Sequence, residues 1–435
     1  MKTIFKTTAI LATFTAAPAF AAPYCDALTS ADTLPKKYAK RGPFHSDTDS
    51  GWIVGQDQLK AKFKATDEVK MLWKHITSEF AEHGMTLSVM SAPPRPLFVP
   101  DGVLAQFGVD ASAKQKVQVA YSGYIAALNE AGIPAPDLTG LTGSEMGNSY
   151  YFKRDTHWTP RGAAISAAYL KQHVTDTSAE DTLQDIAFDQ SYEEKGSLST
   201  VVEKVCGTRP AMETVTAATY AKAGSAQSLL GDVETDTKIA LVGTSFSARY
   251  KRDAYQVADA LAHSFDASVD NFALTGGGLA GSMMAFIQSG ALRDGGYTTV
   301  VWETPYTTPM TDVHGLRQVL GALQSLRAEN EIGAGTVKLS DKWTNLKHTF
   351  NATDHAGLAI RIPGVSTGKL DIELIGADGE KQRVKLVKSD RIPADQQSDI
   401  WPLSLAELSD PNIKRIKMRL RGAKGSKPAH ITLMN

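Results

Sequence analysis

Three residues of the chain have the types needed for catalysis by an activated hydroxyl group: Ser245, His157 and Asp155. Asp155 and His157 are two positions apart, a spacing that lets the carboxylate hydrogen-bond imidazole Nδ1 and leaves Nε2 free to take a proton from a serine. Ser245 lies in the segment Gly243-Thr244-Ser245-Phe246-Ser247, directly after an apolar run. These residues could therefore supply the nucleophile, the base and the orienting acid of an acyl-transfer reaction.

Each part also has a simpler interpretation. Ser245 could do no more than cap a helix. Asp155 and His157 could bind a metal ion, but no further His or Cys stands near them at a ligand spacing, so we expect no metal site. The acyl-transfer interpretation is favoured because all three residue types occur together.

A run of three glycines is a second candidate element of the site, at Gly276, Gly277 and Gly278. Glycines let the backbone approach a ligand closely and present N–H donors, so the run could complete an oxyanion hole. It could equally be a flexible turn. It lacks the spacing of a dinucleotide-binding fingerprint, which excludes a Rossmann interpretation.

Short apolar runs alternate with helical patterns through the first three quarters of the chain. Strands are predicted over residues 86–90, 238–242, 269–274 and 298–303. Helices are predicted over residues 117–131, 158–172 and 314–330, and from the Ser245 segment to about residue 261. Thr159-Pro160 is a strong helix-start signal. Such alternation predicts a parallel sheet with helices on both faces, and ligands bind such sheets at the carboxyl ends of the strands.

The pattern changes to strict alternation of apolar and polar residues after about residue 345. Together with an Asp-Gly turn, this predicts an all-β sandwich over residues 346–435. The fold class is therefore α/β, with a parallel sheet and flanking helices over residues 22–345, followed by a C-terminal β-sandwich domain.

Residues 1–21 have two lysines, a short apolar stretch and an Ala-Phe-Ala cleavage site, and this predicts a signal peptide and export. In an oxidising compartment the two cysteines, Cys25 and Cys206, are expected to form a disulfide. The alternative is two unrelated free thiols.

The net charge of −1 argues against a nucleic-acid binder. It is the sum of −6 over residues 1–345 and +5 over residues 346–435. Basic side chains recur on alternate positions of the predicted strands. Lys381, Arg383 and Lys385 are predicted to share one face. Lys417, Arg419 and Arg421 are predicted to share another. They could be a solvated face that prevents edge pairing, or a surface that attracts a polyanion.

The sequence resembles the periplasmic alginate O-acetyltransferase family, SGNH hydrolase-like acetyltransferases of bacterial exopolysaccharide biosynthesis. The resemblance covers nearly the whole chain after residue 21. The motifs that carry it are Asp155-Thr156-His157-Trp158-Thr159, Gly243-Thr244-Ser245-Phe246-Ser247, Val301-Trp302-Glu303-Thr304-Pro305 and Gly51-Trp52.

The resemblance implies that Ser245 is the nucleophile, His157 the base and Asp155 the orienting acid, with oxyanion donors around Ser245 and Gly276–Gly278. It implies substrate contacts at Arg249 and Tyr306, and we extend this expectation to further basic and aromatic residues, Trp302, Lys417, Arg419 and Arg421. The glycine run is plainer than the family pattern.

The resemblance further implies an acetyl donor supplied by a membrane-bound partner, no cofactor, a carbohydrate-binding C-terminal domain and a uronic-acid polymer as acceptor in the periplasm. Two alternatives remain: an acetylesterase that uses the same residues, and a non-catalytic polysaccharide-binding scaffold of an export complex.

Overall fold

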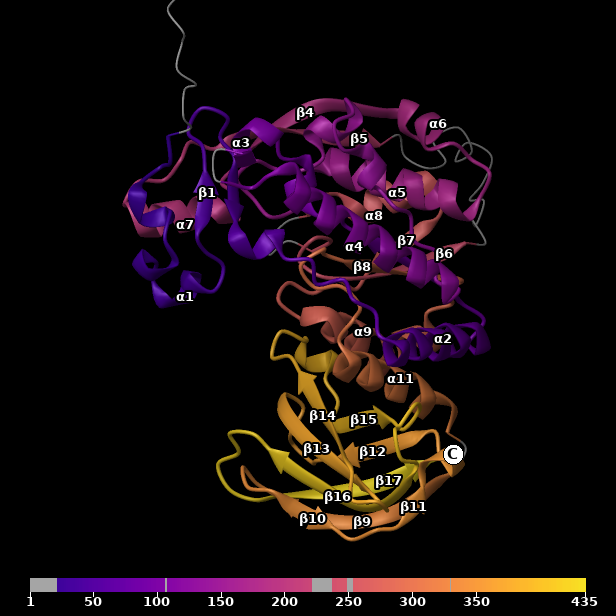
Figure 1. Ribbon diagram of the computed structural model, residues 1–435. Helices are drawn as coiled ribbons and strands as arrows, with labels where there is room; N and C mark the ends of the chain where they lie inside the picture. Colours follow the sequence, from indigo (N-terminus) through magenta and orange to yellow (C-terminus); the bar gives the residue numbers. More distant parts are fainter. Residues whose placement is uncertain (1–21, 106–107, 221–236, 249–252, 329) are drawn as a thin grey trace, which may run out of the picture.

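The computed structural model describes residues 22–105, 108–220, 237–248, 253–328 and 330–435. The chain forms two regions, an α/β region and a C-terminal region made of strands (Figure 1). The predicted signal peptide lies outside the described residues. In the described part of the chain, no helix combines the length and the apolarity that crossing a membrane requires.

The centre of the first region is a four-stranded parallel sheet, as predicted. Its strand order is β3-β8-β6-β7. The bounds are β3 Thr86–Ser91, β6 Lys238–Val242, β7 Ser268–Asn271 and β8 Thr299–Thr304. β8 and β6 are inner strands and almost wholly buried, which explains their apolar runs, whereas β7 is a largely exposed edge strand.

Helices cover both faces of this sheet (Figure 1). α5 and α8 pack against each other, and α11 packs against α2 and α9. The bounds are α2 Asp67–Glu82, α4 Ala111–Glu130, α5 Pro160–Val174, α8 Val257–Phe265, α9 Gly278–Gln288 and α11 Val313–Arg327. The start signal is confirmed, because Thr159 caps α5 by accepting a hydrogen bond from the Gly162 N–H.

The prediction of a helix directly after Ser245 is wrong for the residues that the structure describes there, up to residue 248. Residues 244–248 form a turn in which Ser247 N and Ala248 N donate to Thr244 O. α8 begins only at Val257, because Gln256 has a φ of 54° and a left-handed residue cannot continue a right-handed helix. The serine therefore stands on a tight turn at the end of β6.

The predicted disulfide between Cys25 and Cys206 is confirmed. It joins the start of the described chain to α7, Ser197–Cys206, over a small separate core. The short elements nearby are α1 Lys36–Ala39, β1 Phe44–Ser46 and β2 Ile53–Gly55, and the other short helices are α3 Asp101–Ala105, α6 Ala179–Gln184 and α10 Ala291–Asp294. A two-stranded antiparallel pair, β4 Ile186–Glu194 with β5 Glu213–Tyr220, was not predicted.

The C-terminal region is a sandwich of two antiparallel sheets, which confirms the predicted fold class. One sheet has the order β10-β16-β13-β14 with β11 beside β16, and the other has the order β15-β12-β17-β9. The bounds are β9 Glu331–Leu339, β10 Thr344–Leu346, β11 Phe350–Asn351, β12 Gly357–Arg361, β13 Gly368–Gly376, β14 Lys381–Lys388, β15 Ile400–Ser404, β16 Asn412–Leu420 and β17 Lys427–Met434.

The sandwich begins earlier in the chain than the predicted boundary at residue 346. β9 pairs along its length with β17, and β10 pairs with β16, so both belong to the β-region. The glycines at Gly333 and Gly335 interrupt the apolar alternation of β9 and obscure its strand pattern. The boundary therefore lies near Glu331.

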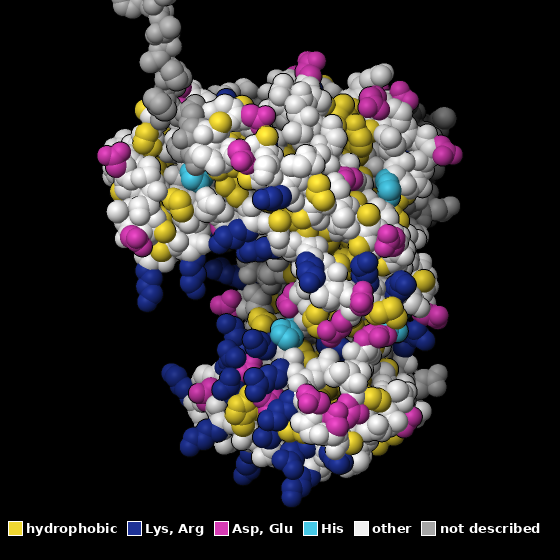
Figure 2. All heavy atoms as spheres, viewed as in Figure 1, with side chains coloured by type: hydrophobic (Ala, Val, Ile, Leu, Met, Phe, Trp, Pro, Cys, Tyr) yellow, Lys and Arg dark blue, Asp and Glu magenta, His cyan; other side chains and the backbone are white. Residues whose placement is uncertain are grey.

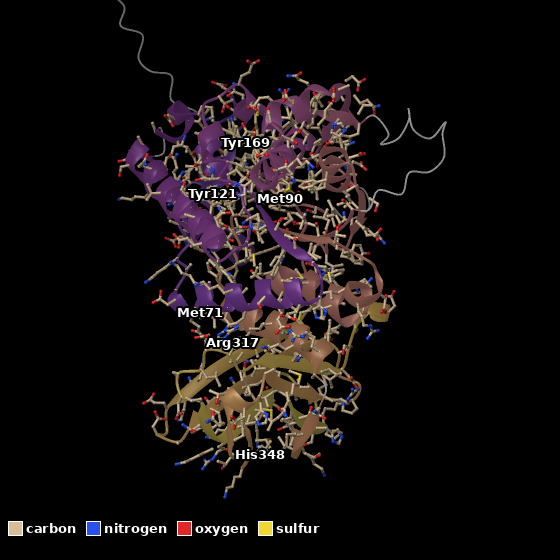
Figure 3. All side chains as sticks on the ribbon, turned by 90° about the vertical axis from the view of Figure 1, so that its right-hand side faces the viewer. Met71, Met90, Tyr121, Tyr169, Arg317 and His348 are labelled. Atoms are coloured by element: carbon tan, nitrogen blue, oxygen red, sulfur yellow. A yellow bond between two sulfur atoms is a disulfide. The ribbon has the colours of Figure 1, made fainter. Side chains whose placement is uncertain are left out.

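The two regions are joined through α11, which packs on β15 and β14. Arg317 of α11 is fully buried between them (Figure 3) and donates to Ser404 O at 3.4 Å, to Ala406 O and to Glu407 O at 2.8 Å. The same guanidinium pairs with Glu68 of α2 at 2.7 Å. A β-carbon at Gly321 would lie 2.6 Å from the Ser404 N atom, so this glycine permits the close approach of β15 to α11.

We expect Arg317→Ala to lower the free energy of unfolding by about 3 kcal/mol, because it removes a fully buried side chain and leaves Glu68 and the carbonyl groups of Ser404, Ala406 and Glu407 without their donor. The control is Arg327→Ala, which removes an exposed α11 arginine paired with Glu79 at 3.2 Å and should cost less than about 1 kcal/mol. Urea unfolding followed by tryptophan fluorescence measures both. Equal losses for the two variants would contradict the role of Arg317.

Candidate active site

The nucleophile turn, residues 243–248, follows the carboxyl end of β6. Gly243 lies directly beside Glu303, and a β-carbon there would be 2.5 Å from Glu303 Oε2 and 2.8 Å from Glu303 Cβ. Only glycine fits between the two strands at this point without displacing the glutamate. The turn is thus held tightly against the end of β8.

The structure brings Ser245, His157 and Asp155 together. His157 Nε2 lies 2.9 Å from Ser245 Oγ, and His157 Nδ1 is hydrogen-bonded to Asp155 Oδ1. Asp155 Oδ1 also accepts the His157 N–H at 3.0 Å, and its Oδ2 accepts the Ser197 N–H at 2.6 Å. This is the order of contacts that serine acyl-transfer chemistry requires.

Asp155 is held as an anion. The residue is 2% exposed, and burial by itself raises the pKa of its carboxyl group, but the charge of His157 and the hydrogen bonds from His157 and Ser197 outweigh burial. The net result is a pKa well below the usual range. The carboxylate can therefore orient the imidazole and stabilise the imidazolium that forms when the serine is deprotonated.

The imidazole of His157 is fixed between aromatic side chains. It stacks on Tyr255 with ring centroids 5.0 Å apart and contacts Phe246 at 4.6 Å. Trp158 Nε1 donates to Phe246 O at 2.9 Å, which ties the His157 segment to the nucleophile turn. These contacts limit the rotation of the base.

A buried guanidinium supports the other end of the His157 segment. Arg95 is fully buried and donates to Phe152 O, Lys153 O and Ile53 O at 2.6–3.1 Å, and it lies over the Trp52 ring. This role of Arg95 was not predicted from the sequence. A lone arginine among prolines and apolar residues was the available signal.

The glycine run lies beside the nucleophile turn. Three hydrogen bonds join the chain before and at the start of this run to the turn: Leu274 N to Gly243 O at 3.0 Å, Asn271 Nδ2 to Ser247 O at 3.0 Å, and Thr275 Oγ1 to Ala248 O. Gly276 and Gly278 have φ values of 78° and 73°, which side chains rarely adopt. Gly277 lies between them with a negative φ. Their service as oxyanion donors stays a prediction.

Two of the aromatic residues expected to contact substrate are buried. Trp302 is fully buried in β8, so the prediction that it contacts a polymer is corrected: its side chain has no exposed surface. Tyr306 is 3% exposed and packs edge-on against Tyr151. Burial raises its pKa. Arg249 lies outside the described residues.

The two predicted groups of basic residues lie on one face of one sheet rather than on two faces. β14 carries Lys381, Arg383 and Lys385, and β16 with the residue after it carries Lys417, Arg419 and Arg421. β13 runs between these strands. Figure 2 shows Lys and Arg side chains gathered over this part of the β-region, beside a hollow between the two regions.

Two acidic residues of β13 partly neutralise this basic face. Asp371 pairs with Arg419 at 2.7 Å and with Arg421 at 2.6 Å, and Glu373 pairs with Arg383 at 2.7 Å. Arg419 also lies over the ring of Trp343, 4.9 Å from its centroid. The arginines are thus fixed in place around a groove of about 370 Å³, which His314 of α11 also lines.

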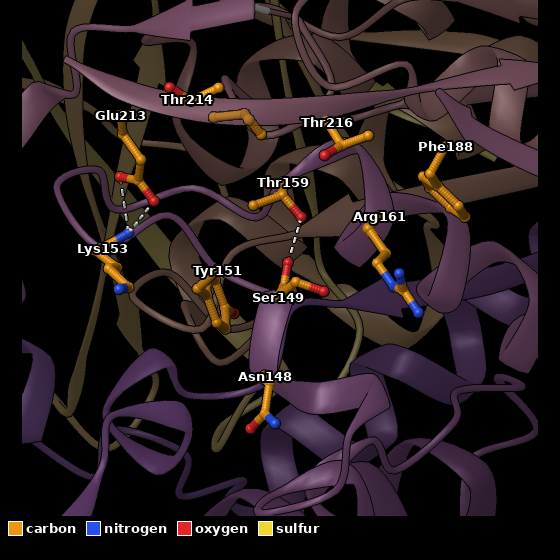
Figure 4. Close-up of a pocket in the computed structure, with 11 residues that line it drawn as sticks. Asn148, Ser149, Tyr151, Lys153, Thr159, Arg161, Phe188, Glu213, Thr214 and Thr216 are labelled. Atoms are coloured by element: carbon orange, nitrogen blue, oxygen red, sulfur yellow. Dashed lines mark hydrogen bonds between the residues drawn. The ribbon is translucent and has the colours of Figure 1, made fainter. Parts of the chain in front are cut away.

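A second cavity, of about 270 Å³, lies beside the His157 segment but does not include Ser245 or His157 in its lining (Figure 4). Tyr151, Lys153 and Thr159 form one wall, and β5 residues including Glu213 form another. The Glu213 carboxylate accepts the Lys153 N–H at 2.9 and 3.0 Å. Nowhere in the described ranges do three His, Cys, Asp or Glu side chains come together as metal ligands.

A parallel α/β sheet that carries a Ser–His–Asp arrangement at its carboxyl edge places the chain among proteins with an SGNH hydrolase-like domain. Residues 49–306 match the family described as "SGNH hydrolase-like domain, acetyltransferase AlgX", and the chain belongs to this family.

The chain is 28% identical over 298 residues to the "Alginate biosynthesis protein AlgX" of Pseudomonas syringae pv. tomato, a match that covers 66% of this chain and 61% of that protein. It is 26% identical over 280 residues to the "Probable alginate O-acetylase AlgJ" of Azotobacter vinelandii, covering 58% of this chain and 66% of that protein. The solved structure of Pseudomonas aeruginosa AlgX covers 94% of this chain and 99% of its own, with a TM-score of 0.71 at 20% identity, and shows the same fold.

We expect Asp155→Asn to lower kcat for acyl transfer by about a thousand- to ten-thousandfold, because an amide favours the wrong imidazole tautomer and cannot balance the imidazolium charge. Burst kinetics with an activated acetyl ester measure the loss. The matched control is the exposed Asp176→Asn, which should behave as wild type. A loss below about tenfold for Asp155→Asn would show that this carboxylate does not serve the base.

Proposed function

We propose that the protein is an O-acetyltransferase that moves an acetyl group through Ser245 onto hydroxyl groups of an anionic exopolysaccharide, an alginate-like polyuronate. The observation that carries the proposal is the Asp155–His157–Ser245 chain of hydrogen bonds in a member of an acetyltransferase family. The names of the relatives, which refer to alginate biosynthesis and alginate O-acetylation, support the choice of polymer.

The reaction follows from this geometry in two halves. In the first, Ser245 Oγ attacks the acetyl carbonyl carbon of the donor while His157 Nε2 takes the Oγ proton. The donor's oxygen then leaves with that proton, and acetyl-Ser245 remains. In the second, a sugar hydroxyl gives its proton to His157 and attacks the acetyl carbon, and Ser245 regains the proton as it leaves.

The basic face of the β-region supports an anionic acceptor. Its cations lie on two strands of one sheet around a groove, and the exposed ring of Trp343 offers an aromatic surface there. A carboxylate-rich polymer is attracted to such a face over several ångströms and is held by several weak contacts at once. We therefore assign polymer capture to the β-region and chemistry to the α/β region.

The donor and the compartment complete the proposal. We propose that a membrane-bound partner of the export complex supplies the acetyl group, that no cofactor takes part, and that the protein works in the periplasm after removal of residues 1–21. The disulfide between Cys25 and Cys206 supports an oxidising compartment.

The decisive test is incubation with an acetyl ester, with and without oligouronates, followed by mass spectrometry of the sugar. We expect acetylated oligouronate from the wild type and about a thousandfold less from Ser245→Ala, because the nucleophile is gone. Ser325→Ala on α11 is the matched control and should retain full activity.

Other outcomes of this assay overturn the proposal in favour of a specific alternative. Release of acetate with no acetylated sugar at any acceptor concentration identifies an acetylesterase. Binding of oligouronate without ester turnover identifies a scaffold. Undiminished transfer by Ser245→Ala shows that the serine is not the nucleophile.

The basic face gives a separate prediction about binding. Among the described residues Lys385 and Lys417 form no ion pair, so Lys385→Gln with Lys417→Gln removes charge without unpairing a carboxylate. We expect oligouronate affinity of the full chain to fall about three- to tenfold, with a weaker dependence on salt. Lys427→Gln on the other sheet is the control. Equal binding of neutral glycans, or binding insensitive to salt, would contradict the prediction.

A further inference from the structure

A second buried carboxylate lies beneath the nucleophile and has no part in the mechanism described above. Glu303, at the end of β8, is fully buried. Its oxygens contact the residues on either side of Ser245: the Thr244 N–H at 2.6 Å, the Thr244 hydroxyl at 3.1 and 3.2 Å, and the Ser247 hydroxyl at 3.1 Å. This carboxylate therefore holds the nucleophile turn from below.

The hydrogen-bond pattern favours the ionised form of Glu303. The Thr244 N–H can only donate, and the Thr244 hydroxyl oxygen accepts the Phe246 N–H at 3.3 Å, which directs its proton toward Glu303. A protonated carboxyl group would have to place its own proton against these donors. The turn is therefore best satisfied by an anion.

The surroundings of Glu303 provide few compensating charges. Opposite it on β3 is Met90, and beside it, directly after the end of β6, is Gly243. From the segment before α5 comes His157, whose own carboxylate partner is Asp155. In the described ranges no lysine or arginine forms an ion pair with Glu303, and His157 is the ionisable group whose charge acts on it.

We propose, on the basis of the function proposed above, that Glu303 is a positioning residue for the acyl-transfer site: its anion fixes the turn that aims Ser245 at His157 and adds a second negative charge that stabilises the His157 imidazolium. When the Oγ proton moves to Nε2, the new positive charge interacts with two carboxylates: Asp155, which contacts Nδ1, and Glu303, on which the charge of His157 acts. In a buried site with little solvent screening, such a charge acts strongly.

Burial raises the pKa of Glu303 to about 7, although the hydrogen bonds from Thr244 and Ser247 and the charge of His157 oppose the rise. Glu303 thus loses its charge as the pH falls through about 7. Its ionisation therefore contributes to the acid limb of the pH–rate profile.

The test is the pH dependence of the acylation burst with a small acetyl ester, which needs no sugar. Glu303→Gln keeps the shape and one acceptor but removes the charge. We expect the plateau rate to fall about tenfold. The acid limb should move to lower pH by about one unit, because the variant has no carboxyl group with a pKa of about 7 that must ionise before the site is active.

Ser247→Ala should shift the same limb in the opposite direction. It removes a donor that favours the ionised form of Glu303. The pKa of Glu303 therefore rises, and its carboxyl group ionises only at higher pH. This variant also decides the question if Glu303→Gln does not fold, which thermal unfolding would reveal. Asp410→Asn, a carboxylate-to-amide change in the β-region, is the control and should leave the limb in place.

A merely structural role for Glu303 would lower the rate without moving the limb. Unshifted limbs in both variants therefore overturn the inference, whatever their plateau rates. Failure of the proposed function is distinguishable, because a Ser245→Ala protein that still shows the burst would refute the nucleophile itself.

Discussion

The 2.9 Å contact between His157 Nε2 and Ser245 Oγ joins residues 88 positions apart, and the first region depends on keeping that contact. Neither partner lies in a helix or a sheet. His157 belongs to a loop pinned by Arg95 at one side and by the cap of α5 at the other. Ser245 belongs to a turn pinned by Glu303. Because Arg95 and Glu303 stand on rigid elements, the His157 loop and the nucleophile turn acquire a fixed geometry.

The division of charge between the regions complements this arrangement. The α/β region is acidic overall and the β-region is basic, but the basic face is ordered by two acidic residues of β13. Asp371 and Glu373 reduce the net positive charge of this face. They also pair with three arginine side chains, which limits the motion of these side chains and the entropy lost when a polymer binds. Arg317 fastens this region to α11, the helix whose His314 lines the groove.

Much of the fold could be predicted because its signals are local. The inner strands are continuous apolar runs, and Thr159-Pro160 marks the start of α5. The two-residue spacing of Asp155 and His157 also identified their contact.

Other features could not be predicted because they depend on distant parts of the chain. The helix expected directly after Ser245 is absent from the described turn, and α8 begins only after Gln256, which adopts a left-handed conformation. β9 is a strand because β17 pairs with it. Trp302 looked like a ligand contact by motif, yet its strand is buried on both sides. Glu303, next to it, reads as the polar end of an apolar run until the nucleophile turn is placed above it.

The central claim is that Ser245 carries the acetyl group between donor and polymer. The most direct measurement is mass spectrometry of the protein quenched after mixing with an isotopically labelled acetyl ester, followed by a chase with oligouronate. We predict that the label appears on the peptide containing Ser245 and then moves to the sugar at the rate of turnover. Label that never reaches Ser245, or that leaves it only as free acetate while oligouronate is present, would contradict the claim.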